Sequence, residues 1–346
     1  MNIGLTFDLR TQYEQMGLSK EQTAEFDSEE TIDYLEQGIR SAGHEVSRIG
    51  NIKSLVEKLA LGMRWDLVFN ISEGLHGRSR EAQIPALLEA YSIPYTFSDP
   101  LTLALSLDKA MAKAVVRVAG VLTPDYFVVD SFERAALPPL KGFPLFIKPL
   151  SEGTGKGIDT ASIVWDEQAF KERCEFVLKM YNQPAIVEEY LPGREFTVGI
   201  LGTGKNASAV GTMEVKLLDN ADPLVYSYAN KEFCEDRVKY VLCRDEAIVR
   251  EASEIALMAY RAIGARDAGR VDLKGDAAGR LSFIEINPLA GLHPSHSDLP
   301  ILCALNDIGY DELISGIIQS ALERSEIKPL AAGRWQPDNC ENCSRS

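Results

Sequence analysis

The chain lacks any apolar run that approaches the roughly 20 residues of a transmembrane helix, so we expect no membrane partner. Its start, MNIGLTFDLR, contains neither the basic segment nor the apolar stretch of a signal peptide. Basic residues are also scarce, because 36 lysines and arginines stand against 51 acidic residues, for a formal net charge of −15. This balance argues against nucleic acid as a partner. Any bound phosphate must be held by a few local lysines, backbone N–H groups and divalent cations.

Cysteine is sparse as well. Six cysteines are spread over 346 residues, which is not the pattern of a small disulfide-stabilised protein. A chain of this length buries roughly three quarters of its unfolded surface and needs no such crosslink. We therefore expect a reducing, cytoplasmic compartment. The motif Cys340-x-x-Cys343 lacks the further ligands of a structural zinc site.

Two common nucleotide-binding signatures are missing. The first expected strand continues as TFDLRTQ instead of G-x-G-x-x-G, which argues against an NAD-binding Rossmann lobe. The pattern G-x-x-x-x-G-K-[ST] occurs nowhere in the chain, which excludes the P-loop NTPases.

The N-terminal part alternates between strand and helix patterns. Apolar runs at 3–7 and 65–71 are typical of covered strands. Between them, Asp27 and Glu30 have the spacing of a capping box and predict the start of an amphipathic helix. A second helix is expected at 81–91. This order predicts an α/β lobe of about 100 residues.

The rest of the chain continues with a helix at 108–119, for which Asp108 is the expected N-cap. The later elements are predicted in this order: strand 143–149, glycine-rich turn 152–157, helix 166–180, strand 185–190, strand 196–202, a long polar connection 219–243, helix 246–263 and hairpin 269–287.

The hairpin GRVDLKGDAAGRLSFIEIN is the most informative segment. Alternate residues of a strand share a face, so Arg270 and Asp272 point to one side. Glu285 and Asn287 share a face on the return strand. A four-residue turn would place Arg270 opposite Glu285. Clustered oxygen ligands suit Mg²⁺, whereas a solvated face with an Arg–Glu cross-strand pair would use the same residues.

Two further features suit a bound phosphate. The turn EGTGKG follows the strand that contains Lys148, and its backbone N–H groups can surround an anion, with Lys156 adding charge. Lys109 lies in the first turn of a helix, where its charge opposes the helix dipole unless an anion binds there. Alternatively, EGTGKG is an ordinary glycine turn of a hairpin, and Lys109 is an ordinary surface lysine.

The order of these features resembles the ATP-grasp fold, and most closely the D-alanine–D-alanine ligase group. The resemblance rests on SLDK (106–109), FIKPLSEGTGKG (146–157), IVEEYLPGREFTVGILG (186–202) and GRVDLKG…FIEINPLAGL (269–292). It covers roughly residues 1–325 and implies an α/β fold with α+β lobes that enclose ATP. The expected domains are an N-terminal α/β substrate lobe (1–105), a central ATP-grasp lobe (106–190), a C-terminal ATP-grasp lobe with the metal site (191–328) and a flexible tail (329–346).

The resemblance implies roles in ATP binding. Lys109 and Lys148 would contact the α and β phosphates. The loop that contains Gly153, Gly155 and Gly157 would close over the β and γ phosphates. Adenosine would be recognised by the segment at the next strand end: Glu188 at the adenine amino group, the main chain of Glu189 and Leu191 at the ring, Tyr190 beside it, and Glu195 at the ribose.

It also implies the groups that act on the reacting atoms. Two Mg²⁺ ions, for which Mn²⁺ could substitute, would be held by Asp272, Glu285 and Asn287. The implied catalytic set is Arg270, the backbone N–H of Gly291, Lys231 near the γ-phosphate, and Thr154, which stands where the group has a serine.

Six residues are candidates for binding small-molecule amino-acid substrates: Glu25, Glu73, His76, Glu81, His293 and His296. Glu25 matches the glutamate that receives the amine of the first substrate. Glu73 and Glu81 could receive a substrate amine, although a solvated helix start also accounts for Glu81. His76 is expected at the mouth of this pocket. His293 and His296 would bind an acceptor carboxylate or act as a general base, unless they are ordinary loop histidines.

The resemblance implies an enzyme that activates a carboxylate as an acyl phosphate and then forms a peptide bond with an amine. Departures from the group fall in substrate-contacting regions: Glu232 replaces a tyrosine, and NISEGLHGRSREAQ and PLAGLHPSHSDLP differ from the group's patterns. We therefore expect a substrate pair other than D-alanine with D-alanine. The alternatives are a cell-wall D-alanine–D-alanine (or D-alanine–D-lactate) ligase and an ATP-binding protein without turnover. A homodimer is expected from the resemblance alone.

Overall fold

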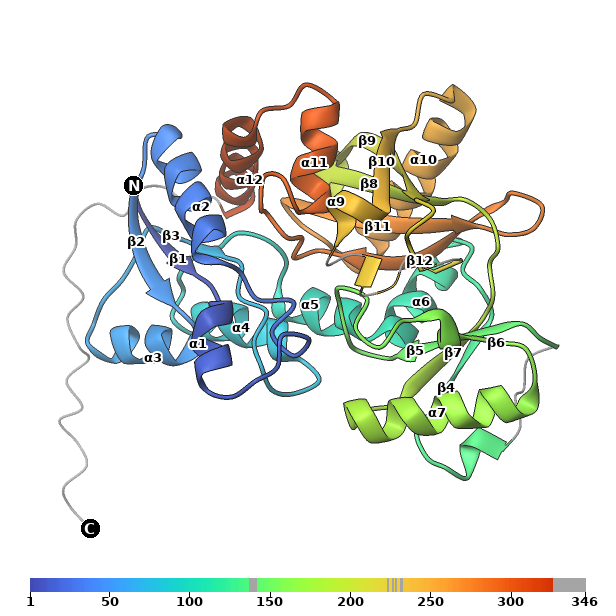
Figure 1. Cartoon of the computed structure of the whole chain (residues 1–346). Coiled ribbons are helices and arrows are strands. Elements are labelled where there is room, and N and C mark those ends of the chain that lie inside the picture. The colour runs from blue at the N-terminus through green and yellow to red at the C-terminus, as the bar shows by residue number, and fades with distance from the viewer. Residues whose placement is uncertain (137–141, 223, 226, 228, 231–232, 326–346) are drawn as a thin grey trace, which may run out of the picture.

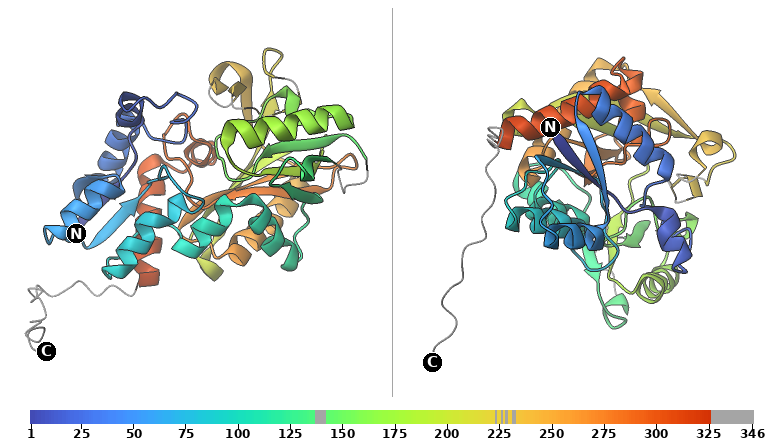
Figure 2. Two further views of the ribbon diagram at one scale, coloured as in Figure 1. Left: turned by 90° about the horizontal axis from the view of Figure 1, so that it is seen from below. Right: turned by 90° about the vertical axis from the view of Figure 1, so that its left-hand side faces the viewer.

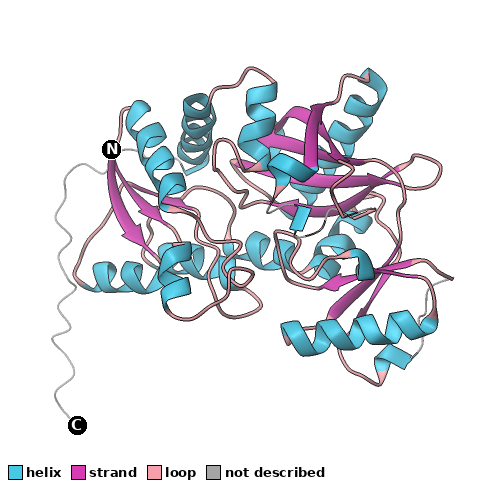
Figure 3. Cartoon of the chain, viewed as in Figure 1, coloured by secondary structure: helices cyan, strands magenta, loops and turns pink. Residues whose placement is uncertain are grey.

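The computed structural model describes residues 1–136, 142–222, 224–225, 227, 229–230 and 233–325. Its strands form three sheets, with helices packed between and around them (Figure 1, Figure 3). The strands are β1 (Asn2–Thr6), β2 (Glu45–Gly50), β3 (Leu67–Asn70), β4 (Tyr126–Val129), β5 (Leu145–Pro149), β6 (Ile163–Val164), β7 (Ala185–Glu189), β8 (Glu195–Leu201), β9 (Ser208–Leu217), β10 (Val238–Leu242), β11 (Ala268–Gly275) and β12 (Leu281–Asn287). The helices are α1 (Arg10–Gln15), α2 (Glu29–Ser41), α3 (Ile52–Ala60), α4 (Gln83–Ala90), α5 (Pro100–Leu107), α6 (Lys109–Val118), α7 (Glu167–Tyr181), α9 (Cys234–Arg237), α10 (Glu246–Ile263), α11 (Asp298–Leu305) and α12 (Tyr310–Ser325).

The N-terminal sheet is parallel, in the order β2-β1-β3, as the alternation of strands and helices predicts. The predicted start of helix α2 is wrong by one residue, because the Ser28 side chain accepts the hydrogen bond from the Thr31 backbone N–H. The carboxylate of Asp27 is therefore not needed as a cap. The helix expected at 81–91 begins as a short 3₁₀ turn, Arg80–Ala82, and continues as α4.

The middle sheet has the order β4-β7-β5-β6, and all its pairs are antiparallel. Phe170, Cys174 and Val177 on one side of α7 are fully buried against this sheet. The glycine-rich turn leaves the end of β5, so that the sheet presents the turn to the neighbouring parts of the chain.

The third sheet has the order β10-β9-β8-β11-β12. Its edge corrects the expectation of one long polar connection over 219–243, because β10 pairs antiparallel with β9 and Val238 lies opposite Leu217. Helix α10 is found with the predicted bounds, since the Asp245 side chain caps it and Gly264 ends it in a left-handed conformation.

The register of the β11–β12 hairpin differs from the sequence expectation. Arg270 pairs with Asn287, and Asp272 pairs with Glu285. Two features cause the difference: the turn spans five residues, 276–280, and a bulge shifts the register after Asp272. The polar side chains still share one face, as the alternation predicts.

Each of the two large hydrophobic cores combines residues from segments that are distant in sequence. Ala112 and Val116 of α6 are buried with β8 and β11, in the core of the five-stranded sheet. Ile314 and Ile317 of α12 are buried with the N-terminal sheet, and Figure 2 shows α12 beside α2. The domain bounds given above therefore stay a prediction. In the described part of the chain, no helix combines the length and the apolarity that crossing a bilayer would require.

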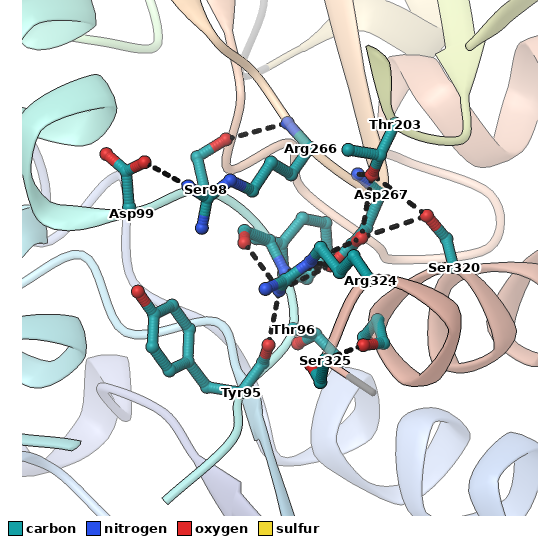
Figure 4. Close-up of polar contacts among 12 residues, drawn as sticks. Tyr95, Thr96, Ser98, Asp99, Thr203, Arg266, Asp267, Ser320, Arg324 and Ser325 are labelled. Atoms are coloured by element: carbon teal, nitrogen blue, oxygen red, sulfur yellow. Dashed lines mark hydrogen bonds and ion pairs between the residues drawn. The ribbon is translucent and has the colours of Figure 1, made fainter. Parts of the chain in front are cut away.

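A buried ion pair joins the N-terminal part to the last sheet and helix (Figure 4). Asp267 is fully buried, and the Arg324 guanidinium lies 2.9 Å from its carboxylate. The same carboxylate accepts hydrogen bonds from the Ser320 hydroxyl at 2.9 Å and from the Phe97 backbone N–H at 2.7 Å. Arg324 also donates to the carbonyl oxygens of Tyr95 and Phe97. These bonds fix the relative position of three segments that are distant in sequence.

Candidate active site

A cavity of about 480 Å³ lies between loops of the N-terminal sheet, the glycine-rich turn and the β11–β12 hairpin. Part of its lining consists of carboxylates from the N-terminal part of the chain, among them Glu73 and Glu81. Another part consists of Arg270, Glu285 and the segment that follows β12. Most of the residues expected around the reacting atoms are therefore gathered in one space.

Three residues on the polar face of the β11–β12 hairpin, Arg270, Glu285 and Asn287, line this cavity. Arg270 Nη1 lies 2.9 and 2.8 Å from the two carboxylate oxygens of Asp272, and Asn287 Nδ2 lies 3.3 Å from Asp272 Oδ2. Glu285 lies directly across from Asp272. Two carboxylates and an amide oxygen on one face fit Mg²⁺, and phosphate oxygens would be needed to complete its shell. The residues predicted to hold the metal are thus brought together.

Lys109 connects this polar face to the glycine-rich turn. It is the first residue of α6, where Asp108 caps the helix and binds Arg78 at the surface. The Lys109 side chain is 8% exposed; its Nζ donates to the Glu152 carbonyl oxygen at 2.6 Å and lies 3.4 Å from Glu285 Oε2. The alternative of an ordinary surface lysine is therefore wrong, because the Lys109 side chain is buried at the cavity beside Glu285.

A second, narrower cavity of about 80 Å³ gathers Lys148 and the residues expected around adenosine. Lys148 Nζ lies 3.2 Å from Glu188 Oε2, and Lys113 Nζ lies 2.8 Å from Glu188 Oε1. Burial opposes the charge of Glu188, but the two lysines outweigh it and hold the pKa of this carboxyl below its usual range. Burial lowers the pKa of Lys113 to about 8.

The remaining residues of the expected adenosine site line the same narrow cavity: Glu189, Tyr190, Leu191 and Glu195. Leu191 is buried, whereas Glu189 is exposed. The Glu195 carboxylate is 2.6 Å from Lys274 Nζ, so the group expected at the ribose is held by a cation of β11.

The glycine-rich turn depends on backbone conformations that favour glycine. Gly155 and Gly157 have φ angles of +73° and +69°. A Cβ on Gly157 would lie 2.6 Å from the Pro149 ring, so only glycine fits there. Thr154 has a φ of +49°, and its buried hydroxyl has no hydrogen-bond partner among the described residues. Gly153 and Thr154 line the larger cavity.

Glu25 is where the resemblance expects it, at the larger cavity, but its carboxylate is already engaged. Arg80 Nη2 lies 3.0 Å away, Lys156 Nζ lies 3.1 Å away, and the Gly153 N–H donates to it at 2.6 Å. Burial raises the pKa of Glu25, and the two cations outweigh that effect and hold the pKa far below normal. Glu25 therefore fastens the glycine-rich turn to the N-terminal part.

Glu73 and Glu81 line the same cavity, and neither forms an ion pair with a described residue, although the charge of Arg80 attracts both carboxylates. Burial raises the pKa of Glu81 to about 7, and burial together with repulsion from Glu81 raises the pKa of Glu73 well above normal. Asp27 behaves similarly, since burial and then the charge of Asp8 raise its pKa to about 7. The expectation of a solvated Glu81 is wrong, because this residue is only 8% exposed.

Only some of the histidines and remaining catalytic candidates line the larger cavity. His293, His296 and Gly291 line the larger cavity. The His293 backbone N–H donates to the Ser297 hydroxyl, and His293 Nε2 lies 3.5 Å from Glu30. His76 is exposed and lies outside the lining of both cavities. Lys231 and Glu232, like Cys340 and Cys343, lie outside the described residues.

Several functional candidates were not found from the sequence. Arg80 is buried beside Glu25, and its only signal was its place next to Glu81 in SREAQ. Lys113 lies one turn after Lys109 on α6 and has no pattern of its own. Asp298, at the start of α11, lies 2.8 Å from Arg270 Nη1. Each of these contacts joins segments that are distant in sequence, so spacing could not reveal them.

Comparison with known proteins places this geometry in context. Residues 115–319 match the family model "D-ala D-ala ligase C-terminus". The D-alanine–D-alanine ligase of Bordetella petrii is 33% identical over 274 residues, which cover 78% of this chain and 79% of that protein. A crystal structure of the D-alanine–D-alanine ligase of Bacillus anthracis with ATP has a TM-score of 0.70 at 20% identity and covers 94% of this chain and 99% of the other. The VanG D-Ala:D-Ser ligase of Enterococcus faecalis has a TM-score of 0.71, also at 20% identity, and covers 92% of this chain and 99% of the other.

Proposed function

Because the chain belongs to the D-alanine–D-alanine ligase family of ATP-grasp enzymes, which are ATP-dependent carbon–nitrogen ligases, we propose that it joins two amino acids through an acyl phosphate. The amine of the second amino acid attacks the activated carboxylate of the first, and ADP and phosphate are released. We take the first amino acid as the acyl donor and the second as the acceptor.

One observation carries this proposal: the polar face of the β11–β12 hairpin, Lys109 and the glycine-rich turn meet at a single cavity. A carboxylate is too poor an electrophile to react with an amine directly, and transfer of a phosphoryl group gives it a good leaving group. Such transfer relies on positioning and charge neutralisation. The cavity offers cations, metal-binding oxygens and backbone N–H groups.

The chain's own residues would bind and orient the reactants. Arg270, next to Asp272, is positioned to neutralise charge that develops on a phosphoryl group or on the attacked carbonyl. Mg²⁺ held by Asp272, Glu285 and Asn287 would neutralise phosphate charge when bound. The glycine-rich turn, fastened by Glu25, would keep water away from the reactive anhydride.

For the identity of the amino acids, several relatives of 31–34% identity support D-alanine in both positions, because they are named D-alanine–D-alanine ligases. D-alanine is therefore the first substrate to test, ahead of our expectation of a different pair. A different donor is kept as the second candidate because of one specific contact. The glutamate that would receive the donor's amine, Glu25, is already occupied by Arg80 and Lys156.

The test is ADP release by the purified protein with ATP, Mg²⁺ and a panel of D- and L-amino acids, with mass spectrometry of the product. We expect ADP release that depends on amino acids, at one ADP per dipeptide. ATP binding without ADP release for any pair would contradict the proposal and favour the non-catalytic alternative.

A further inference from the structure

The cavity carboxylates from the N-terminal part of the chain differ in how many positive charges and N–H donors contact them. Glu25 is surrounded by Arg80, Lys156 and the Gly153 N–H, so it has little capacity left for a substrate ammonium group. A fourth group would compete with contacts that also hold the glycine-rich turn. The binding of a cationic ligand therefore falls to the neighbouring acids.

Glu81 is the most informative of these acids. It is 92% buried, lines the cavity, and its carboxylate has no hydrogen bond or ion pair with the residues that the structure describes. Glu73 lines the same wall and is likewise without a described partner. An ionised carboxylate buried without a partner is costly, so its presence at a cavity wall points to a cation that arrives with a ligand.

The nearby cations, Arg80 and Lys109, form no ion pair with Glu73 or Glu81. Arg80 donates to Glu25 and to the Ser151 carbonyl oxygen. Lys109 donates to the Glu152 carbonyl oxygen and faces Glu285. Both attract Glu81 electrostatically, but neither lies within ion-pair distance of it.

A third acid extends the excess of negative charge. Asp27 lines the cavity and is close enough to contribute to the electrostatic repulsion at Glu73. Arg10 attracts Asp27, yet burial and the charge of Asp8 still dominate its environment. Three carboxylates, Asp27, Glu73 and Glu81, thus line the same cavity. A single ammonium group would leave at least one of them unbalanced.

We propose that the acyl donor is an amino acid with a cationic side chain, whose two ammonium groups are bound by Glu73, Glu81 and Asp27. This proposal rests on the proposed ligation, since it describes the donor of that reaction. The donor's carboxylate would then lie toward Arg270 and Glu285, which line the same cavity. The ammonium groups would supply ion-pair partners that Glu73 and Glu81 do not have among the residues the structure describes.

The test compares donors that match in shape and differ in charge. The pairs are 2,4-diaminobutyrate with norvaline, and ornithine with norleucine, each as both enantiomers. We expect kcat/KM for the diamino member to exceed that of its neutral partner at least tenfold. A neutral partner that reacts equally well or better would overturn the proposal.

Two variants assign the effect to the named carboxylates. Glu81→Gln and Glu73→Gln should each lower kcat/KM for the diamino donor at least fivefold more than kcat/KM for its neutral partner, because the diamino donor has two ammonium groups to bind and the neutral partner has one. Glu57→Gln, on the exposed side of α3, is the matched control and should keep the preference. An unchanged preference in both cavity variants would contradict the assignment.

A binding measurement separates this proposal from the proposed function. Calorimetry of 2,4-diaminobutyrate against norvaline, in the presence of a non-hydrolysable ATP analogue and Mg²⁺, needs no turnover. Preferential binding of the diamino acid without ADP release would support the cation site and overturn the ligase proposal. ADP release with D-alanine, without preferential binding of the diamino acid, would do the reverse.

Discussion

The acidic residues of the cavity have different surroundings, and their surroundings decide what each can do. Asp272 is bonded by Arg270, and Glu285 lies 3.4 Å from Lys109. Glu73 and Glu81 have no described cation within bonding distance. We therefore expect removal of the charge to reduce activity at the proposed metal site and to increase the stability of the substrate-free protein at Glu81.

Glu285→Gln should reduce amino-acid-dependent ADP release by roughly 100-fold or more, because it removes a charge from the proposed metal site. The midpoint of thermal unfolding should change by less than about 2 °C, since the side chain is 19% exposed and its ion pair with Lys109 is long, at 3.4 Å. ADP formation and circular dichroism measure the two effects. Near-normal turnover would contradict the metal assignment.

Glu81→Gln should stabilise the substrate-free protein, and the gain should grow with pH. The folded-state pKa of Glu81, about 7, lies above its ordinary value of 4.5, so the folded state binds more protons between these pH values and loses stability as the pH rises through them. The variant avoids this loss. We expect its unfolding midpoint to exceed that of the wild type by roughly 2–4 °C at pH 8 and by much less at pH 4.5. An equal difference at both pH values would count against an unpaired carboxylate.

At the scale of elements, the sequence predicts helix bounds and caps well, because these depend on residues that are close together in the chain. Helix α10 has the bounds expected from the sequence, and Asp108 caps α6 as expected. The β11–β12 register was not predictable, because a bulge changes the pairing without a clear sequence signal. Strand β10 was missed because its pattern, VKYVL, lies within a polar connection and gains its partner only from β9.

The glycine-rich turn provides a test of the role of Glu25. Glu25→Gln should weaken the ion pairs with Arg80 and Lys156, and with them the attachment of the turn over the phosphates. We expect KM for ATP to rise at least fivefold, while KM for the donor changes less than twofold. Steady-state kinetics with each substrate varied in turn measures this. A rise confined to the donor would instead support the role that the resemblance implies, as receiver of the amine.

At the scale of the whole molecule, segments from both ends of the chain share cores. Helix α12 packs on the N-terminal sheet, and α6 packs on the five-stranded sheet. The resemblance of motifs predicted three lobes and the nucleotide residues, but these cross-lobe contacts depend on long-range packing that periodicity does not encode. The same applies to Arg80 and Asp27, whose neighbours come from other segments.

The Asp267–Arg324 pair links these parts through a buried carboxylate. Arg324→Ala should leave the fully buried Asp267 carboxylate without its cation and lower the free energy of unfolding by about 3 kcal/mol. Urea denaturation measures the loss. Asp267→Asn with Arg324→Ala should lose less than the sum of the two single variants, because the two residues interact directly. Additive effects would show that the pair contributes little.

The central claim, that the cavity at the β11–β12 hairpin activates a carboxylate by phosphorylation, can be tested with an isotope. A donor labelled with ¹⁸O in both carboxylate oxygens is incubated with ATP, Mg²⁺ and the acceptor, and the released phosphate is analysed by mass spectrometry. We expect one ¹⁸O atom in each phosphate, because the oxygen that bonds phosphorus leaves with it when the amine attacks. Unlabelled phosphate accompanying the peptide product would contradict an acyl phosphate.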